Sequence, residues 1–375
     1  MDPLRIGVLG TARISATALL GPAASVPEVT VAAVAARDQA RARAYAEQHG
    51  IPVAYGDYQA LLADADIDAV YNPLPNSLHG PWTLRAIAAG KHVLCEKPLA
   101  SNAAEAEQVA EAAEAAGLVV MEAMHYRYHP LIRRLAELAG ELGPVRHIQC
   151  WTSFVIGDQD DIRYDYELGG GALMDGGCYA LDCLRLLGAG EPDVTAALAD
   201  PYQRVPGRGP DRAGAAADRA MAVRLVFPDD ATAWFESAFT LDGQFRADVH
   251  VNCQHGHVWV QDFIRAHWGH LVAVRNGAVI ADERGSGDSS YTEQLRAFAA
   301  AITAGLPVPT SAAHAAVTMR LIDDAYRAAG LLPRLSCGRL MPGVAARPTG
   351  ALPGAAGAAG RDPWHSRRAG PGLRQ

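Results

Sequence analysis

The chain has 375 residues, 50% of them hydrophobic and 20% charged, a composition typical of a globular protein with about two domains. The formal net charge at pH 7 is −8, so the surface as a whole does not attract phosphate backbones or anionic lipid, and we expect no nucleic-acid partner. No apolar run approaches the roughly 20 residues that cross a bilayer, which argues against a membrane protein.

The first 125 residues alternate between short apolar runs and helix patterns. They open on MDPLRIGVLG, which lacks the basic segment and long apolar core of a secretory signal. Strands that alternate with helices predict βαβ units, and hence a parallel sheet covered by helices on both faces. The predicted strands are 4–10, 29–36, 67–75, 91–98 and 118–124, and the predicted helices are 12–25, 38–50, 55–64, 76–90 and 101–117. We therefore expect residues 1–125 to form a doubly wound α/β domain.

Capping residues mark the ends of two of these helices. Gly21 and Pro22 are expected to close the first helix, because neither residue favours a helix interior. Asp38 is a predicted N-cap for the second helix, and Gly50 is its predicted C-terminal stop.

From about Tyr126 the pattern changes to a helix followed by long alternating strands. Such alternation predicts a mostly antiparallel sheet with one face against helices. Turn residues at 228–230 and 241–244 predict hairpins between successive strands. The predicted strands are 145–156, 221–227, 231–240, 244–253 and 257–263, and the predicted helices are 131–139, 291–305 and 311–330. Residues 126–335 are thus expected to form a second α/β domain with a large, mostly antiparallel open sheet.

Two segments have the composition of flexible chain. Ala, Gly and Pro make up most of residues 341–375, which bury too little apolar surface to offset the entropy of ordering. We expect a disordered tail there and a flexible insertion at 200–219.

Cysteine and histidine spacing gives little sign of a metal site. The six cysteines are scattered without a CxxC pair, which indicates reduced thiols in a cytoplasmic protein. His255 and His257 lie two residues apart, but no thiol pair accompanies them, so zinc is a weak alternative. We expect a cytoplasmic protein with no bound metal.

The first strand and helix are joined by IGVLGTARIS, an imperfect dinucleotide-binding fingerprint. Gly10 permits the tight turn, Ala12 is small enough for a pyrophosphate to approach the backbone, and Ser15 takes the third small position. The unpaired N–H groups of the helix start attract a phosphate. Taken alone the motif also fits a plain strand–helix turn, but the βαβ context favours a Rossmann domain. The residues expected to bind the dinucleotide here are Gly10, Thr11, Ala12, Arg13 and Ile14.

The end of the second strand bears on the choice between NAD and NADP. An acidic residue there binds the ribose hydroxyls of NAD, but this chain has Ala35, Ala36 and Arg37. The Arg37 guanidinium is suited to bind a 2′-phosphate, whereas Asp38 suits a helix N-cap better than a ribose ligand. We therefore expect NADP as the cofactor, with NAD as the alternative.

The stretch KHVLCEKPLAS has two opposite charges and a proline directly after a buried strand. Ligands of open α/β sheets bind outside the carboxyl ends of the strands, so Glu96 and Lys97 are expected to point toward the nicotinamide end of the crevice. Taken alone, the charges also fit a solvated strand end. Pro98 restricts the backbone there, and the bond before it is a candidate for a cis peptide.

A glycine-rich segment, GGGALMDGGCYALDCLRLL, opens a helix with three polar side chains. Asp175, Tyr179 and Asp182 are spaced to lie on one helix face, which fits either a solvated surface or acid–base chemistry. Tyrosine titrates near pH ~10 when unperturbed. A nearby ammonium such as Lys97 is expected to lower the pKa of Tyr179 toward working pH.

Together, VLGTARIS, YNPLPNSLH, CEKPLA, MEAMHYRYHP and GGGALMDGGCYALD resemble the Gfo/Idh/MocA family, named for glucose–fructose oxidoreductase, inositol dehydrogenase and rhizopine catabolism. The resemblance covers roughly residues 4–330. It implies a Rossmann domain followed by an α/β domain whose large open sheet often forms oligomer contacts. It also implies NAD(P)-dependent oxidation or reduction of a sugar, cyclitol or related ring alcohol.

Position by position, the resemblance makes Lys97 the catalytic lysine and Asp175 and Tyr179 the substrate-facing pair. Many members have histidine where this chain has Tyr179. Tyrosine resembles the branch of dimeric dihydrodiol dehydrogenase and NADP-xylose dehydrogenase, in which it is thought to be the acid–base group. The resemblance also implies that Pro73, Asn76, His79 and Glu96 lie against the cofactor, that Tyr126 and Arg127 line the substrate pocket, and that His129 is structural.

We therefore expect hydride transfer between the nicotinamide and a ring hydroxyl or ketone of a sugar or related polyol. Tyr179 would transfer the proton, Lys97 would hold the substrate oxygen, and Asp175 would orient the substrate or the lysine. The alternatives are a trans-dihydrodiol dehydrogenase, a family member that cleaves glycosides through transient redox chemistry, and a non-catalytic NADP-binding sensor. A homo-oligomer formed through the open sheet is also expected.

Overall fold

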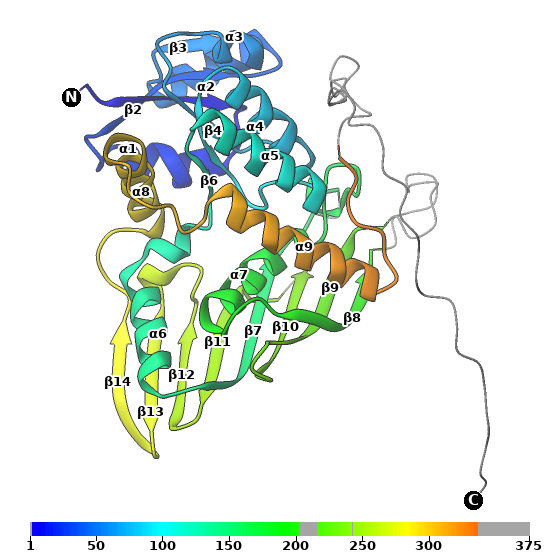
Figure 1. The fold of residues 1–375 in the computed structure, drawn as a ribbon. Helices are drawn as coiled ribbons and strands as arrows, with labels where there is room; N and C mark the ends of the chain where they lie inside the picture. Colours follow the sequence, from blue (N-terminus) through cyan, green and yellow to red (C-terminus); the bar gives the residue numbers. More distant parts are fainter. Residues whose placement is uncertain (1, 159, 203–215, 242, 337–375) are drawn as a thin grey trace, which may run out of the picture.

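The computed structural model describes residues 2–158, 160–202, 216–241 and 243–336. They form two β-sheets with helices packed on them, one in the upper and one in the lower part of Figure 1. The tail expected at 341–375 lies outside the described residues, as does most of the insertion expected at 200–219.

The first sheet has six parallel strands in the order β3-β2-β1-β4-β5-β6. The strands are β1 (Leu4–Leu9), β2 (Val29–Ala35), β3 (Val53–Tyr55), β4 (Ala69–Asn72), β5 (His92–Cys95) and β6 (Val120–Glu122). The predicted parallel sheet is confirmed. Its strand order reverses between β1 and β4, which opens a crevice at the carboxyl ends of these two strands.

The helices of this half begin and end close to where the sequence predicts. They are η1 (Ala16–Leu20), α1 (Gly21–Ala23), α2 (Gln39–His49), α3 (Tyr58–Leu62), η2 (Asn76–Leu78), α4 (His79–Ala88) and α5 (Ala103–Ala116). Asp38 caps α2 by accepting the Arg41 N–H at 2.8 Å, and Gly50 ends it with φ 68°, as predicted. The prediction that Gly21 and Pro22 end the first helix is wrong, because the π-helical turn η1 runs directly into α1 and helical backbone continues through both residues to Ala23.

The second sheet has eight strands in the order β14-β13-β12-β11-β7-β10-β9-β8. They are β7 (Val145–Val155), β8 (Asp193–Pro201), β9 (Asp218–Val226), β10 (Thr232–Thr240), β11 (Arg246–Cys253), β12 (Gly256–Gln261), β13 (His270–Arg275) and β14 (Ala278–Arg284). Within the described part of this sheet only β7 and β10 pair in parallel, so the predicted mostly antiparallel sheet is confirmed. The hairpin predicted at 241–244 is wrong, because β10 and β11 lie on opposite sides of β7 and do not pair.

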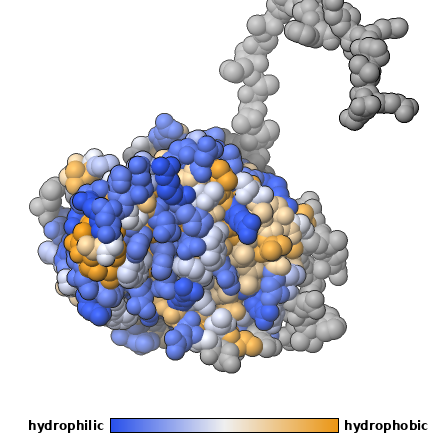
Figure 2. Space-filling model, turned by 90° about the horizontal axis from the view of Figure 1, so that it is seen from below, coloured by the Kyte–Doolittle hydropathy of each residue, from blue (hydrophilic) through white to orange (hydrophobic). Residues whose placement is uncertain are grey.

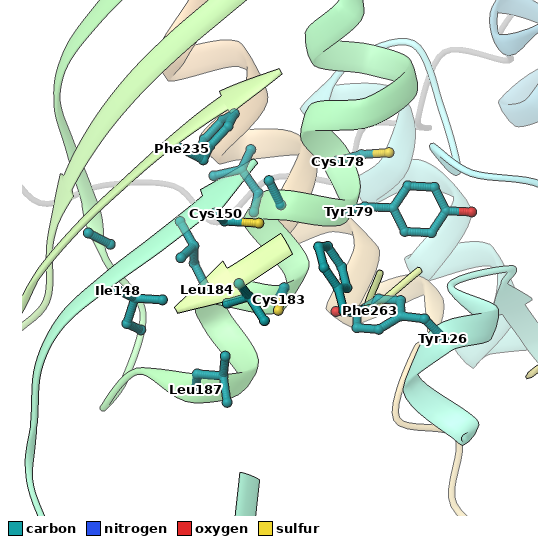
Figure 3. Packing of buried hydrophobic residues seen from close by; sticks show 14 of the residues in the cluster. Tyr126, Ile148, Cys150, Cys178, Tyr179, Cys183, Leu184, Leu187, Phe235 and Phe263 are labelled. Carbon is teal, nitrogen blue, oxygen red and sulfur yellow. The ribbon is translucent and has the colours of Figure 1, made fainter. Parts of the chain in front are cut away.

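Helices α6 (Pro130–Glu141), α7 (Cys178–Leu187) and α9 (Ala312–Ala328) share a hydrophobic core with the second sheet. Figure 3 shows the part of this core where Leu184 and Cys183 of α7 meet Ile148, Cys150 and Phe235 of the strands. Helix α9 also packs against α5, so it joins the two halves (Figure 1). The short helices here are η3 (His125–Tyr128), η4 (Ile162–Tyr164), η5 (Leu173–Gly177) and η6 (Ala266–Trp268).

Helix α8 (Ser290–Ala304) packs on the first sheet, although the sequence analysis expects residues 126–335 to form the second domain. Leu295, Phe298 and Ala299 of α8 are buried with strand residues of the first sheet. In Figure 1, α8 accordingly lies beside α1. The apolar face of a helix can be read from the sequence, but the surface that it covers cannot.

Among the described residues, no helix combines the length and the apolar character needed to span a membrane. Figure 2, a view from below the orientation of Figure 1, shows a mostly hydrophilic face with separate hydrophobic patches.

Candidate active site

A cleft of about 1180 Å³ runs along the carboxyl ends of the first sheet to the start of α7 and the end of β7. All the predicted site residues except Tyr126 and Arg127 line it. Those that do are Gly10, Thr11, Ala12, Arg13, Ile14, Arg37, Pro73, Asn76, His79, Glu96, Lys97, Asp175 and Tyr179. The fold therefore brings together segments that are up to 169 positions apart, between Gly10 and Tyr179.

The turn after β1 has the shape that a dinucleotide requires. Gly10 has φ 94°, a conformation that favours glycine, and its N–H bonds the Ala35 carbonyl at 2.7 Å. A Cβ at Gly10 would lie 3.1 Å from Leu74, so a side chain there would crowd the wall of the cleft. Ala12 leaves the backbone open to a ligand, and Ser15 is fully buried behind it. These residues fit a bound pyrophosphate.

Three arginines line the same end of the cleft: Arg13, Arg37 and Arg41. Arg41 Nε donates to Thr11 Oγ1 at 2.7 Å, which ties the start of α2 to the turn after β1. The Asp38 carboxylate accepts the Arg41 N–H and so serves as the N-cap of α2, as the sequence predicts. Arg41 was not predicted: it lies in the first turn of α2, just after the N-cap Asp38, whereas Arg37 lies in the loop before that cap.

Lys97 lies at the centre of the cleft, in the loop that leaves β5. The Lys97–Pro98 peptide bond is cis, as the sequence suggests. Lys97 Nζ donates to Asp175 Oδ1 at 2.7 Å and to the Asp175 carbonyl at 2.9 Å. The other carboxylate oxygen of Asp175 accepts from Arg163 Nε at 3.0 Å. Because both side chains of the Lys97–Asp175 pair are mostly buried, with 12% and 14% exposed, the ammonium has a fixed position.

Neighbouring charges decide the ionisation of this pair. Burial on its own would lower the pKa of Lys97, but the Asp175 carboxylate and the other groups around the ammonium together outweigh burial, and the pKa is raised. Burial would likewise raise the pKa of Asp175, but Lys97 and Arg163 hold it below its ordinary value. Lys97 and Asp175 are therefore a charged pair at neutral pH.

Arg163 is the residue of this cluster that sequence reasoning missed. It lies in η4, and it contacts Asp161 at 3.1 Å as well as Asp175. The available signal was its position shortly before the Gly169–Gly171 run, where a close backbone approach is expected.

Tyr179 is the first-turn residue of α7 whose ring forms part of the cleft wall. It is 4% exposed, and its hydroxyl points away from the packed core (Figure 3). Its ring lies 5.1 Å from Lys97 Nζ, and the edges of His125 and Tyr126 complete its surroundings. Within the described residues, the Tyr179 hydroxyl has no hydrogen-bond partner, so it is available to a ligand in the cleft.

The prediction that Lys97 lowers the pKa of Tyr179 is wrong. Burial raises the pKa of Tyr179 well above its ordinary value, and the nearby Tyr291 and Glu96 add to the shift. The ammonium does not offset the burial, because its charge is already balanced by Asp175 at 2.7 Å. Tyr179 is therefore a protonated phenol at neutral pH.

Tyr126, Arg127 and Asp182 do not line the cleft. They form a separate buried cluster, in which the fully buried Asp182 carboxylate accepts from the Tyr126 hydroxyl at 2.5 Å and lies 3.6 Å from Arg127. Asp182 departs from the expected stripe because the π-helical turn η5 intervenes after Asp175, and the 3.6-residue period does not continue through it.

The loops on the other wall of the cleft are held by His79 and Glu96. The two ring nitrogens of His79 lie 2.7 Å from the Pro98 carbonyl and 2.6 Å from the Leu74 carbonyl. Burial lowers the pKa of His79 to about 4, so the neutral ring donates to one carbonyl at a time. Glu96 accepts from the Tyr71 hydroxyl at 2.7 Å. Both residues therefore orient the loops that they join, in addition to lining the cleft.

Pro73 lies on the loop after β4, and Asn76 begins the short helix η2 that follows this loop. Asn76 Nδ2 donates to the Gly169 carbonyl at 3.0 Å, which links this loop to the glycine-rich segment before α7. His129 lies outside the cleft and caps α6 through Leu131, as the sequence suggests. In the described parts of the chain, no group of three or more His, Cys, Asp or Glu side chains is arranged to hold a metal ion.

Comparison with protein families gives two matches. Residues 4–124 match the oxidoreductase family with an NAD-binding Rossmann fold, and residues 132–259 match the GFO/IDH/MocA C-terminal domain.

Individual proteins similar to this chain include dehydrogenases and reductases. The D-xylose 1-dehydrogenase (NADP(+)) 2 of Haloferax volcanii is 39% identical over 339 residues, which are 87% of this chain and 97% of that protein. A dTDP-3,4-didehydro-2,6-dideoxy-alpha-D-glucose 3-reductase of Streptomyces violaceoruber is 43% identical over 198 residues, 52% of this chain and 57% of that protein. The crystal structure of a 3-ketoreductase from Actinomadura kijaniata in complex with NADP and TDP-benzene has a TM-score of 0.77 at 28% identity, covering 87% of this chain and 98% of that chain.

Proposed function

The chain belongs to the Gfo/Idh/MocA family of oxidoreductases, and on that premise we propose that it transfers hydride between NADP(H) and a ring hydroxyl or ketone of a sugar or related polyol. The observation that carries this proposal is the convergence of the Lys97–Asp175 pair and the Tyr179 hydroxyl on one cleft, next to a turn that fits a dinucleotide.

Each catalytic side chain has a role that follows from its ionisation. Tyr179, a protonated phenol, gives its proton to the oxygen of a ketone and takes one back when an alcohol is oxidised. The Lys97 ammonium donates to the same oxygen and stabilises its developing negative charge. Asp175, held by Arg163, keeps that ammonium in place. The nicotinamide ring, when bound, supplies or accepts the hydride.

The charges near the substrate support a neutral sugar over a sugar nucleotide. Arg163 is already paired with Asp161 and Asp175, and Arg265 is paired with Asp262 at 2.7 Å. A diphosphate at this end of the cleft would have to compete with these carboxylates for the guanidinium groups.

The direct test is a panel of free aldoses, keto-sugars, cyclitols, trans-dihydrodiols and nucleotide sugars, followed by the absorbance of NADPH. We expect stoichiometric oxidation or formation of NADPH with at least one neutral sugar or polyol. Cofactor that stays bound and is recycled in each turnover would instead indicate glycoside cleavage through transient redox chemistry. No turnover with any compound would contradict the proposal.

Arg37 and Arg41 are proposed to bind the 2′-phosphate of NADP. Replacing Arg37 with alanine removes one charge-assisted contact worth ~1.5–3 kcal/mol, so we expect KM for NADPH to rise about 10- to 100-fold while KM for NADH changes little. Steady-state kinetics with both cofactors measures this shift. Arg43→Ala is the matched control, because Arg43 is exposed on the same helix and does not line the cleft. Equal effects on NADPH and NADH would exclude a role for Arg37 in recognising the phosphate.

The open face of the second sheet is proposed to join copies of this chain. Trp151, Trp234, His250 and Trp259 alternate with core residues, so they lie on the face away from the helices. Their rings form a contiguous partly exposed patch, with centroids 5.1 Å apart for Trp151 and Trp234 and 5.5 Å apart for Trp151 and His250. Aromatic side chains at the centre of a surface patch are typical of protein interfaces.

Replacing Trp234 with arginine at this patch is expected to dissociate the oligomer into monomers, because it introduces an unpaired charge into the interface. Light scattering coupled to gel filtration reads the mass directly. Leu306→Arg, an exposed position away from the sheet, should leave the mass unchanged. A wild-type chain that is already monomeric at micromolar concentration would contradict this part of the proposal.

A further inference from the structure

The loop that carries Lys97 is held by buried ionisable side chains. On one side, Pro98 faces His79 and Glu96 accepts from Tyr71. On the other side, the Leu99 N–H donates to Glu122 Oε1 at 2.8 Å, two residues after Lys97. Since Leu99 is fully buried, its N–H has no access to water and depends on this acceptor.

The backbone of Glu122 is held in place by strand pairing and by hydrogen bonds to Thr310. Glu122 ends β6 and is 1% exposed, and its strand pairs with β5 through Cys95. Its own N–H donates to the Thr310 carbonyl at 2.8 Å, and its carbonyl accepts from the Thr310 hydroxyl at 2.8 Å. The carboxyl group is therefore presented to the loop from a backbone that is fixed on two sides.

The raised pKa of the Glu122 carboxyl group is compatible with a position close to the Lys97 ammonium. Burial raises the pKa of Glu122 to about 8, and the nearby Asp182 raises it further, while Leu99, Arg185 and Lys97 act in the opposite direction. The thiols of Cys95 and Cys178 are the other titratable groups that face it. Its second oxygen, Oε2, is buried without a partner among the described residues. A neutral carboxyl accepts the Leu99 N–H without competing with Asp175 for the ammonium.

We propose that Glu122 is a positioning residue, which sets the place of the Lys97 ammonium by accepting the Leu99 N–H. This inference rests on the proposed hydride transfer, because it assigns Glu122 a role in that reaction. Loss of the acceptor frees the Lys97 loop while the cofactor turn and Tyr179 stay in place. Turnover should therefore fall while the affinity for NADPH is kept.

The test compares two variants of Glu122. Glu122→Met keeps the size of the side chain and removes the acceptor, so kcat is expected to fall about 10- to 100-fold, the range that a displacement of about 1 Å produces. Glu122→Gln keeps a neutral acceptor oxygen and is expected to retain kcat within about threefold. The dissociation constant for NADPH, measured by fluorescence titration, should change less than about twofold in both variants.

A matched control separates positioning from a general loss of stability. Asp323 is also a buried carboxylate that accepts a backbone N–H, that of Ala103 at 3.1 Å, at the start of α5 and away from the Lys97 loop. Asp323→Leu should lower the melting temperature as Glu122→Met does, yet leave kcat near that of wild type. If Glu122→Met does not fold, Glu122→Asp is used in its place, because it withdraws the acceptor by one carbon–carbon bond and keeps the carboxyl group.

Two results would overturn the inference. Equal losses of kcat in the Gln and Met variants would show that acceptance from Leu99 is not what matters. A similar loss of kcat in Asp323→Leu would show that Glu122→Met acts through a general loss of stability and not through the position of Lys97. Both results leave the proposed function intact if wild-type protein oxidises NADPH with a sugar, whereas inactive wild-type protein counts against the proposed function itself.

Discussion

Replacing Tyr179 with phenylalanine is expected to lower kcat by about 10²–10⁴-fold, the contribution of a general acid–base group. The ring fills the same space, so its contacts with His125 and Tyr126 remain, and only the hydroxyl group is lost. Binding of NADPH should be unchanged. Steady-state turnover together with a fluorescence titration of the cofactor measures both quantities.

The control for this variant is Tyr45→Phe, which removes a phenol on α2 that does not line the cleft. It should keep wild-type turnover. Full turnover in Tyr179→Phe would remove the phenol from the chemistry and leave Lys97 as the proton donor.

Replacing Lys97 with alanine is the second substitution that is expected to lower kcat strongly. It removes the donor proposed to stabilise negative charge on the substrate oxygen, and loss of one such donor lowers kcat by about 10²–10³-fold. Asp175 keeps Arg163 as a partner at 3.0 Å, so the variant does not leave an isolated buried carboxylate. The dissociation constant for NADPH should change much less than kcat.

Lys91→Met is the matched control, because Lys91 is a buried lysine that donates to the Asp64 and Ile67 carbonyls away from the cleft. It should lower stability and leave kcat nearly unchanged. If Lys97→Ala weakens NADPH binding more than it slows turnover, the lysine is a cofactor clamp and the proposed role is wrong.

Local patterns were enough to predict the parts of the site that lie at strand ends. In a parallel sheet all carboxyl ends share one edge, so Gly10 after β1 and Lys97 after β5 had to come near each other once the βαβ pattern was recognised. The N-cap role of Asp38 followed in the same way from residues close in sequence.

Features that depend on distant contacts could not be predicted. Arg163 lies in η4, a single short turn with no sequence period, so no pattern indicates that its guanidinium meets Asp175. The raised pKa of Tyr179 depends on how much surface the surrounding elements remove from water, which a spacing rule does not contain. The separation of Asp182 from the cleft likewise depends on the π-helical turn η5.

Several strands of the second sheet also could not be predicted from local sequence patterns. Strands β8, β13 and β14 were not predicted, and the chain order of β10 and β11 suggested a hairpin that does not exist. In β8 most side chains are exposed on both faces, so the alternation that marks a half-buried strand is weak. The interposed strand β7 comes from a segment almost a hundred residues earlier, a pairing that local patterns do not encode.

The most direct measurement follows deuterium from NADPH labelled at the transferable position of the nicotinamide. Wild-type protein with a keto-sugar should deliver the label to the carbon that becomes the carbinol, and Tyr179→Phe should do so far more slowly. NADPH that binds in the cleft but transfers no label to any sugar or polyol, in either variant or wild type, would contradict the account.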